Sequence, residues 1–314
     1  MKSNGKIAVI GAGHVGSHCA MSLARCDVCH EIVLIDKDLK KAKAQAMDVA
    51  DALSFPPVDT IVRDGSYVDC KDADIVVIAI GEARLPGQTR LDLLGNSVKM
   101  LSELIKELKP VGIGGIVITI TNPADIVADY VRRGLGLNRR KVFGTGTLLD
   151  TARLIRIISE QTGRRRTDIS AFSMGEHGDS SMIPFSQIRI GGEDLENFKN
   201  FDEAYVLERT RMTGMDIING KNSTEFGIGQ VLADLCGCIL RDEKRVLPLS
   251  VLLEGEYGQM DVHCGVPCRV GRGGIDFIEE LPLSESELSQ LNESCQIIRK
   301  HIALAQEIAP FDAI

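Results

Sequence analysis

Hydrophobic residues in the first half of the chain form short unbroken runs, which alternate with longer segments of helical spacing. The apolar runs lie within KIAVI, EIVLID, DADIVVIAIG and GGIVITITNP. Runs of this kind are typical of parallel strands that are buried on both faces. The segment KDLKKAKAQAMDVADAL, after the second run, has a strongly helical composition. Strands that alternate with helices predict right-handed β-α-β crossovers and a doubly wound parallel sheet.

The pattern changes beyond about residue 145. Two segments, SMIPFSQIRI and MDVHCGVPCRV, alternate in a way that predicts antiparallel strands with one face against helices. Long helices are expected over 150–162, 203–219, 224–240 and 284–306. We therefore predict two domains in close contact around a cleft, a parallel α/β domain over 1–145 and an α+β domain over 146–314.

Composition excludes several classes of protein. Hydrophobic residues make up 44% and charged residues 25% of the 314 residues, as in ordinary globular proteins. The net charge of −8 argues against a general nucleic-acid binder. No apolar run reaches the ~18 residues of a membrane span, and the N-terminus lacks the core of a signal peptide, so we expect a cytoplasmic protein. The nine cysteines have no paired zinc spacing, and we expect buried or free thiols and no metal site.

The first glycine-rich turn has the pattern G-x-G-x-x-G, with glycines at Gly11, Gly13 and Gly16. It follows a predicted strand and opens a predicted helix, and Asp36 lies 20 positions beyond the last glycine. In this Rossmann context the glycines allow a pyrophosphate to approach the positive end of the helix. Asp36 would accept hydrogen bonds from the adenosine ribose and repel a 2′-phosphate. We predict NAD as the cofactor rather than NADP, although lysines soon after Asp36 weaken that preference.

Two short motifs in the second half carry candidate chemistry. LLDTARL places Asp150 and Arg153 one helical turn apart, and GEHGDS places His177 in a turn flanked by glycines. If Asp150 accepts a hydrogen bond from one ring nitrogen, it fixes the tautomer of the imidazole and raises the basicity of the other nitrogen. His177 would then pass a proton to a carbonyl oxygen while NADH delivers hydride to the carbon. Taken singly, each residue also has a purely structural explanation, as a turn histidine, a helix-start acid or a surface ion pair.

The order and spacing of these motifs resemble the lactate/malate dehydrogenase family over essentially the whole chain. The matching motifs are GAGHVG, PGQTRLDLL, ITNPAD, TGTLLDTAR, GEHGDS and GVP. The resemblance implies a small 2-oxo or 2-hydroxy acid as substrate and a homotetramer or homodimer, without nucleic-acid or membrane partners. It also implies His177 as the general acid/base and Asp150 as its orienting partner. Arg153 would clamp the substrate carboxylate with two hydrogen bonds.

The resemblance assigns further residues to the cofactor and the substrate. Asn122 matches a position that contacts nicotinamide and substrate, and Thr224 matches one that lines the far side of the pocket. Gly81 is assigned to the cofactor site, at the start of the loop GEARLPGQTR. This loop would act as a lid whose closure expels water and brings Arg90 to the reacting carbonyl.

Arg84 in the same loop leaves the preferred substrate open. It resembles the specificity position at which lactate enzymes usually have glutamine and malate enzymes have arginine. An arginine facing oxaloacetate would pair with its second carboxylate, whereas with pyruvate its charge would be buried without a partner. The motifs around the loop and His177 are of the lactate type. The chain could therefore be a lactate dehydrogenase with oxaloacetate activity or a dedicated malate dehydrogenase; a non-catalytic NAD-binding protein is a further alternative.

Overall fold

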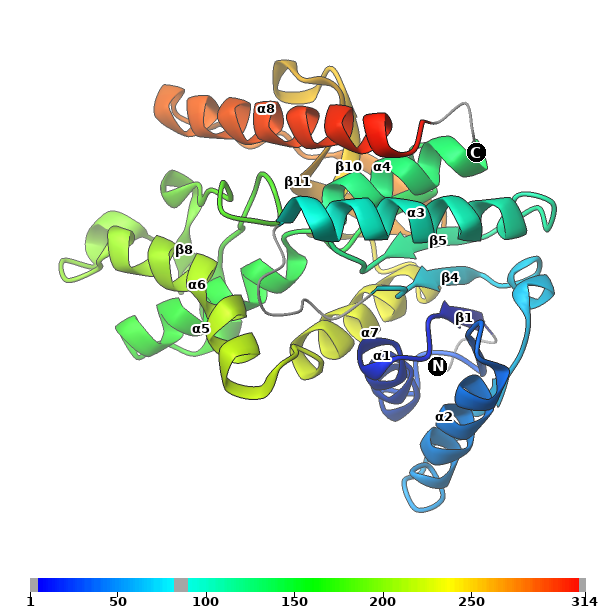
Figure 1. Ribbon diagram of the computed structural model, residues 1–314. Helices are drawn as coiled ribbons and strands as arrows, with labels where there is room; N and C mark the ends of the chain where they lie inside the picture. Colours follow the sequence, from blue (N-terminus) through cyan, green and yellow to red (C-terminus); the bar gives the residue numbers. More distant parts are fainter. Residues whose placement is uncertain (1–4, 82–89, 311–314) are drawn as a thin grey trace.

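The computed structural model describes residues 5–81 and 90–310, with side chains of 90–93 excepted, and its centre is one large sheet (Figure 1). Over the described residues this sheet has nine strands in the order β12-β11-β10-β6-β5-β4-β1-β2-β3. The strands are β1 (Lys6–Ile10), β2 (Glu31–Ile35), β3 (Ile61–Asp64), β4 (Ile75–Ile78), β5 (Ile116–Thr119), β6 (Val142–Gly144), β10 (Arg245–Glu254), β11 (Met260–Gly271) and β12 (Gly274–Ile278). The first six are parallel, which confirms the predicted doubly wound sheet.

Helices cover both faces of the sheet. They are α1 (His14–Arg25), α2 (Leu39–Asp51), α3 (Arg90–Leu108), α4 (Ala124–Leu135), α5 (Leu148–Thr162), α6 (Glu203–Lys221), α7 (Phe226–Leu240) and α8 (Glu285–Ile308). Helices α3, α4 and α8 pack together on one side, and α1 packs against α7 on the other (Figure 1). Helices α5 and α6 pack against each other beside this layered part. The predicted helices are all present, with their ends moved by a few residues.

The order of the parallel strands determines where a ligand can bind. Strand β1 lies between β2 and β4, so the chain order reverses beside it. In open α/β sheets, ligands bind outside the carboxyl ends of the strands at such a switch point. The turns that follow β1, β4, β5 and β6 therefore open toward one common edge, and they carry Gly11, Gly81, Asn122 and Thr145.

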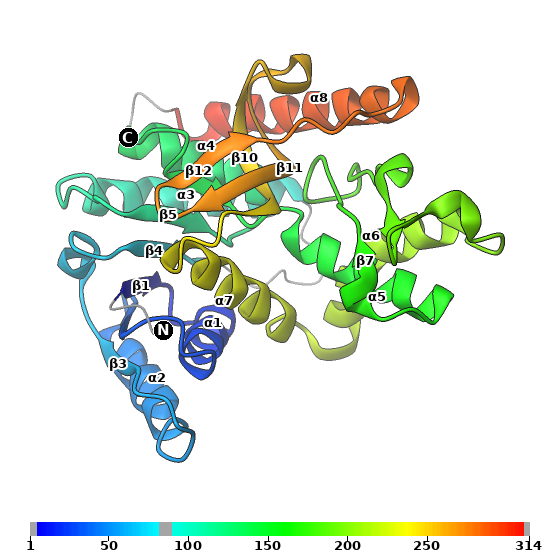
Figure 2. The ribbon, with the colours of Figure 1, turned by 180° about the vertical axis from the view of Figure 1, so that it is seen from behind.

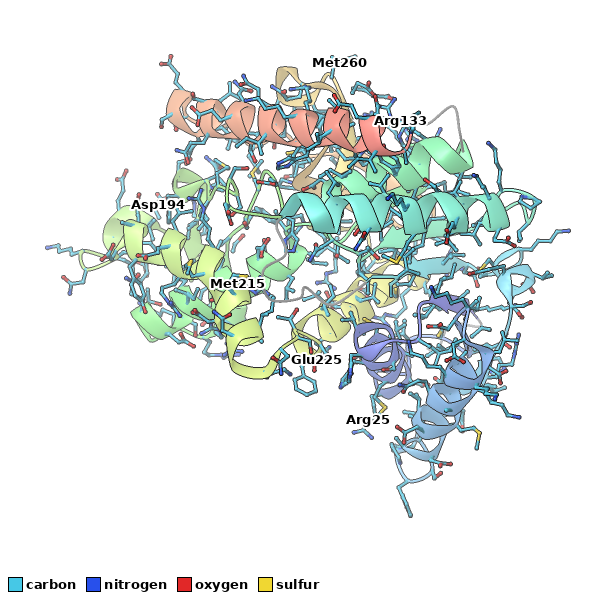
Figure 3. All side chains as sticks on the ribbon, in the orientation of Figure 1. Arg25, Arg133, Asp194, Met215, Glu225 and Met260 are labelled. Atoms are coloured by element: carbon cyan, nitrogen blue, oxygen red, sulfur yellow. The ribbon has the colours of Figure 1, made fainter. Side chains whose placement is uncertain are left out.

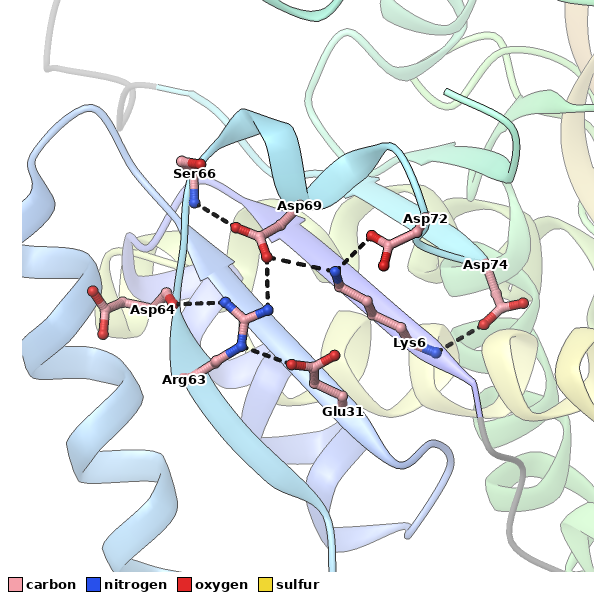
Figure 4. A network of polar contacts seen from close by, with 8 residues as sticks. All are labelled: Lys6, Glu31, Arg63, Asp64, Ser66, Asp69, Asp72 and Asp74. Atoms are coloured by element: carbon pink, nitrogen blue, oxygen red, sulfur yellow. Dashed lines mark hydrogen bonds and ion pairs between the residues drawn. The ribbon is translucent and has the colours of Figure 1, made fainter. Parts of the chain in front are cut away.

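Ion pairs lie at the opposite end of the sheet, near the amino ends of β1 and β2 (Figure 4). The Lys6 ammonium lies 2.7 Å from Asp72 and 3.5 Å from Asp69. The Arg63 guanidinium lies 2.6 Å from Asp69 and 2.7 Å from Glu31. Pairs that are partly exposed to water contribute at most about 1 kcal/mol each. This network joins the amino ends of β1 and β2 to the segment after β3, away from the edge with the glycine-rich turn.

The second half of the chain extends the same sheet. Strands β10, β11 and β12 are antiparallel and join the parallel part where Ser250 of β10 lies opposite Gly144 of β6 (Figure 2). The predicted strand MDVHCGVPCRV is therefore confirmed as β11. Residues 262–268 of this strand are all buried, so both of its faces are covered and the one-sided alternation expected from the sequence is not seen.

The strand predicted over 181–190 is wrong. Met182 makes only a single bridge with Met174, and Phe185–Gln187 form a 3₁₀ turn. Pro184 explains the interruption, because proline has no N–H to donate to a ladder. Only the end of the segment is a strand, β8 (Arg189–Ile190), which pairs with β7 (Ile169–Ser170) and β9 (Glu193–Asp194).

The cysteines behave as small apolar residues. Eight of the nine are buried, all nine are free thiols, and Cys26 is exposed. Burial raises the pKa of Cys19 and of Cys70 to about 12, so these thiols are protonated and unreactive at neutral pH. Within 5–81 and 90–310, no helix combines the length and the hydropathy that crossing a membrane would require.

Candidate active site

The glycine-rich turn after β1 is closely packed at two glycines and open at the third. A Cβ atom at Gly11 would lie 2.5 Å from the carbonyl oxygen of Ala79, and φ there is +105°. A Cβ atom at Gly16 would lie 1.8 Å from the carbonyl oxygen of Gly11. At Gly13 a Cβ atom would meet only the Lys41 ammonium, at 3.9 Å. Gly11 and Gly16 are therefore required by the turn itself, whereas Gly13 leaves space in front of the first N–H groups of α1.

Asp36 lies beside this turn with its carboxylate fixed in place. It accepts hydrogen bonds from the backbone N–H of Ala12 at 2.8 Å and of Asp38 at 3.0 Å, and Lys41 lies at 3.4 Å. Burial would raise the pKa of Asp36, but the two N–H donors and Lys41 hold it below its ordinary value. An ionised carboxylate next to an open glycine turn fits the adenosine ribose and pyrophosphate of a dinucleotide.

Because Gly16 is closely packed and Gly13 is open, we expect Gly16→Ala to impair folding and Gly13→Ala to impair cofactor binding. We expect Gly16→Ala to lower the free energy of unfolding by about 3 kcal/mol, because backbone must move to admit the methyl group. We expect Gly13→Ala to fold like the wild type but to bind NADH about tenfold more weakly, because the methyl group enters the pyrophosphate site. Thermal unfolding and fluorescence titration with NADH measure the two effects. A Gly16→Ala protein as stable as the wild type would contradict the packing described here.

His177 and Asp150 form a close pair in the second half of the chain. Asp150 lies in the first turn of α5, and its Oδ2 is 2.6 Å from Nδ1 of His177. The turn that carries His177 is anchored by backbone hydrogen bonds between Gly175 and Gly265 of β11. Because a carboxylate only accepts, Nδ1 donates its proton to Asp150, and Nε2 is left to exchange a proton with a substrate.

The electrostatics of the pair favour a protonated imidazole. Burial would lower the pKa of His177, but the carboxylates of Asp150 and Asp125 raise it above its ordinary value. Burial would likewise raise the pKa of Asp150, but His177 and Arg153 hold it below its ordinary value. Arg153 donates from Nη1 to Asp150 Oδ1 at 2.9 Å. Asp150 thus stays ionised and stabilises the form of His177 that can donate a proton.

These side chains line a cavity of about 220 Å³, which is large enough for a small acid. Residues predicted from sequence are brought together here from four places in the chain. They are Asn122, Asp150, Arg153, His177 and Thr224. Val15, the second residue of α1, lines the same cavity, so the cavity lies next to the dinucleotide turn. A ligand in this cavity would contact both an imidazole and a guanidinium.

Comparison with known proteins agrees with this geometry. Residues 5–144 match the model of the lactate/malate dehydrogenase NAD binding domain, and residues 147–309 match that of the lactate/malate dehydrogenase alpha/beta C-terminal domain. The chain belongs to the lactate/malate dehydrogenase family. It is therefore an NAD-dependent oxidoreductase that acts on a 2-hydroxy acid.

Relatives of this chain within the family extend over nearly its whole length. An L-lactate dehydrogenase of Fusobacterium nucleatum is 40% identical over 96% of this chain and 97% of its own. L-lactate dehydrogenase 3 of Bacillus anthracis is 41% identical over 95% and 96%, respectively. Among solved structures, a lactate dehydrogenase from a Medee basin deep-sea metagenome library has a TM-score of 0.92 at 34% identity, covering 97% of this chain and 99% of its own. The minor L-lactate dehydrogenase of Enterococcus mundtii also has a TM-score of 0.92, at 30% identity, covering 96% and 98%.

The sequence also assigned Gly81, Arg84 and Arg90 to the family's site, and of these three only Gly81 is fully described; it is not among the residues that line the cavity. Arg84 lies outside the described residues. Arg90 is the first residue of α3, and its side chain is outside the description. Gly81 is exposed after β4, and a Cβ atom there would lie 4.0 Å from Thr121 Cγ2. Their assigned roles remain predictions.

The cavity also contains residues that the sequence reasoning missed. Arg211, Met215 and Ile218 of α6 line it, and they are spaced four and three positions apart, on one helical face. The guanidinium of Arg211 donates to the carbonyl oxygen of Ser181, from Nε at 3.0 Å and from a second nitrogen. Their spacing indicates one helical face, but helices of globular proteins ordinarily have such a face, so the spacing alone did not identify a site.

Proposed function

We propose that the protein interconverts a 2-oxo acid and its L-2-hydroxy acid, with pyruvate and L-lactate as the principal pair. The observation that carries the proposal is the 2.6 Å contact between His177 and Asp150 in a cavity that also contains Arg153. The relatives named L-lactate dehydrogenase, at about 40% identity, support the choice of lactate. The lactate-type motifs around His177 support it as well.

Three residues of the cavity have distinct parts in this reaction. Arg153 binds the substrate carboxylate through two parallel hydrogen bonds, which lysine cannot reproduce. His177 donates the proton on Nε2 to the carbonyl oxygen, and Asp150 stabilises the imidazolium before transfer. Bound NADH supplies the hydride that the carbonyl carbon accepts. In the direction of oxidation, neutral His177 takes the hydroxyl proton instead.

The remaining assignments are part of the same proposal. Asn122 and Thr224, which line the cavity, contact the substrate or the nicotinamide. Gly81 borders the cofactor. Arg90 polarises the carbonyl when the loop closes. The NAD-binding domain covers 1–145 and the substrate domain covers 146–314, a division supported by family models that end at 144 and begin at 147.

A second candidate, a dedicated L-malate dehydrogenase, is favoured by one feature of the sequence. Arg84 stands at the position where an arginine suits the second carboxylate of oxaloacetate. We propose that this residue gives the enzyme oxaloacetate activity in addition to pyruvate activity. An ion pair formed only with the dicarboxylate would favour oxaloacetate, while an unpaired guanidinium near the methyl group of pyruvate would be unfavourable.

The variant Arg84→Gln tests both parts of this proposal. We expect the kcat/KM for oxaloacetate to fall about thirtyfold, or about 2 kcal/mol, because the charge pair is lost. The kcat/KM for pyruvate should stay the same or rise. Arg84→Lys, which keeps the charge, is the control and should retain part of the oxaloacetate activity. If the ratio of kcat/KM for oxaloacetate to kcat/KM for pyruvate is the same in all three proteins, Arg84 does not contact the substrate.

We also propose that the enzyme works as a homotetramer or homodimer in the cytoplasm. Support comes from large apolar side chains that the single chain leaves in water on α2, α6 and α7. The side chain of Met47 is 58% exposed and that of Phe226 is 69% exposed. Figure 3 shows the neighbouring region of α6 and α7, where Met215 and Glu225 are labelled.

A further inference from the structure

A second buried carboxylate, Asp125, contacts the main chain of His177. Its Oδ2 accepts a hydrogen bond from the backbone N–H of His177 at 2.9 Å. Its Oδ1 accepts one from the hydroxyl of Ser250, on β10, at 2.6 Å. The residue is 1% exposed, and it lies in the first turn of α4. Two segments that are far apart in sequence therefore converge on one carboxylate, and one of them is the turn that carries the proton donor.

The surroundings of Asp125 compensate its charge incompletely. The amino end of α4 supplies a favourable dipole, and the two hydrogen-bond donors are neutral. In the described part of the chain, no lysine or arginine forms an ion pair with Asp125. The other titratable groups that act on it are Glu176, next to His177, and the thiols of Cys264 and Cys295 from β11 and α8. The imidazole of His177 is the cation that can balance this carboxylate.

We propose that Asp125 is a positioning residue for proton transfer, which holds the turn of His177 by its backbone and, together with Asp150, stabilises the protonated imidazole. The inference rests on the proposed function, in which His177 donates the proton. Two carboxylates then act on His177 through different contacts. Asp150 binds the ring at Nδ1, and Asp125 binds the main chain of the same residue.

The electrostatic part of the proposal has a definite sign. Removing the negative charge of Asp125 lowers the pKa of His177, because a nearby anion favours the charged form of an imidazole. Reduction of a 2-oxo acid needs protonated His177, so its rate must decline at a lower pH than in the wild type. Burial raises the pKa of Asp125 itself to about 6, so its support is present above that pH and lost below it.

The variant Asp125→Asn removes this charge and little else. The amide oxygen can still accept from the N–H of His177, and the hydroxyl of Ser250 can turn to accept from the amide nitrogen. The charged groups that face His177 from α5 and α6 are Asp150, Arg153 and Arg211, and the variant leaves them in place.

The experiment is the pH profile of kcat/KM for pyruvate reduction in Asp125→Asn, from about pH 5 to about pH 9. We expect the alkaline decline to move about one unit toward acid, which gives about a tenfold loss near pH 8 and little loss near pH 6. The control is Ser250→Ala, which keeps the charge and should keep the alkaline decline of the wild type. A uniform loss at every pH in Asp125→Asn, or an unshifted profile, would overturn the proposal.

A second measurement does not depend on turnover. NMR titration of the His177 ring protons in the NADH complex reports the pKa of His177 directly, in the wild type and in Asp125→Asn. We expect a lower value in the variant, and equal values would overturn the inference. If the wild type reduces no 2-oxo acid, the proposed function fails, whereas the titration still decides whether Asp125 acts on His177. If Asp125→Asn does not fold, Asp125→Ser takes its place, because its hydroxyl oxygen can accept from the N–H of His177 without carrying a charge. The same lowering of the pKa of His177 is expected, and an unchanged pKa would overturn the inference.

Discussion

Replacing His177 with asparagine is expected to lower kcat for pyruvate reduction about a thousandfold, within the range measured for general acids and bases. Asparagine fills a similar space and can still hydrogen-bond Asp150, but it has no proton to donate near neutral pH. The glycine-rich turn and Asp36 are unchanged by this substitution. The dissociation constant of NADH should therefore stay within about twofold of the wild-type value.

The matched control is His30→Asn, a change of the same kind at an exposed position outside the cavity lining. Stopped-flow or steady-state NADH oxidation gives kcat, and fluorescence titration gives the dissociation constant. A His177→Asn protein that keeps most of its activity would show that another group donates the proton. A wild type that binds NADH without any turnover would instead favour a non-catalytic NAD-binding protein.

Replacing Arg153 with glutamine is expected to lower kcat/KM for pyruvate close to a thousandfold, which corresponds to a loss of about 4 kcal/mol of transition-state stabilisation. Two charge-assisted hydrogen bonds to the substrate carboxylate are lost, each worth about 1.5–3 kcal/mol. The side chain of Arg153 is 12% exposed, so water replaces the lost contacts poorly. Arg153 also holds Asp150 at 2.9 Å, and part of the loss reaches His177 through that contact.

Arg153→Lys separates charge from geometry at the same position. It keeps a cation near Asp150 and the substrate but cannot form the parallel pair of hydrogen bonds. We expect an intermediate loss, seen mainly as a higher KM for pyruvate, with NADH binding unchanged. If lysine restores full activity, the carboxylate of the substrate is bound as a point charge rather than by a two-pronged contact.

The part of the fold that depends on local pattern was predictable from the sequence. The parallel strands are buried on both faces, so their hydrophobic runs are continuous and easy to recognise. The glycine-rich turn was predictable for a similar reason, because Gly16 is required by a contact with Gly11 and Gly11 has a φ of +105°, whereas the contact of Gly11 with Ala79 is not local. Asp150 and Arg153 share one helical face, and this follows from their spacing alone.

The residues that were missed depend on contacts between distant segments. Asp125 belongs to the motif ITNPAD, but nothing in the sequence indicates that Ser250 and the N–H of His177 lie against it. The same is true of Ser294, whose hydroxyl accepts from the backbone N–H of Glu176, next to His177. Partners separated by 52 to 125 positions are brought together only by the complete sheet and by α8.

The most direct test of the account is steady-state oxidation of NADH by the wild-type protein with pyruvate and with oxaloacetate, at one pH near neutrality. We expect turnover with both acids and a kcat/KM of at least about 10⁴ M⁻¹ s⁻¹ for pyruvate, as is common for enzymes with their own substrates. If kcat/KM for oxaloacetate exceeds kcat/KM for pyruvate tenfold or more, malate is the principal product. Tight binding of NADH without oxidation by either acid would contradict the account.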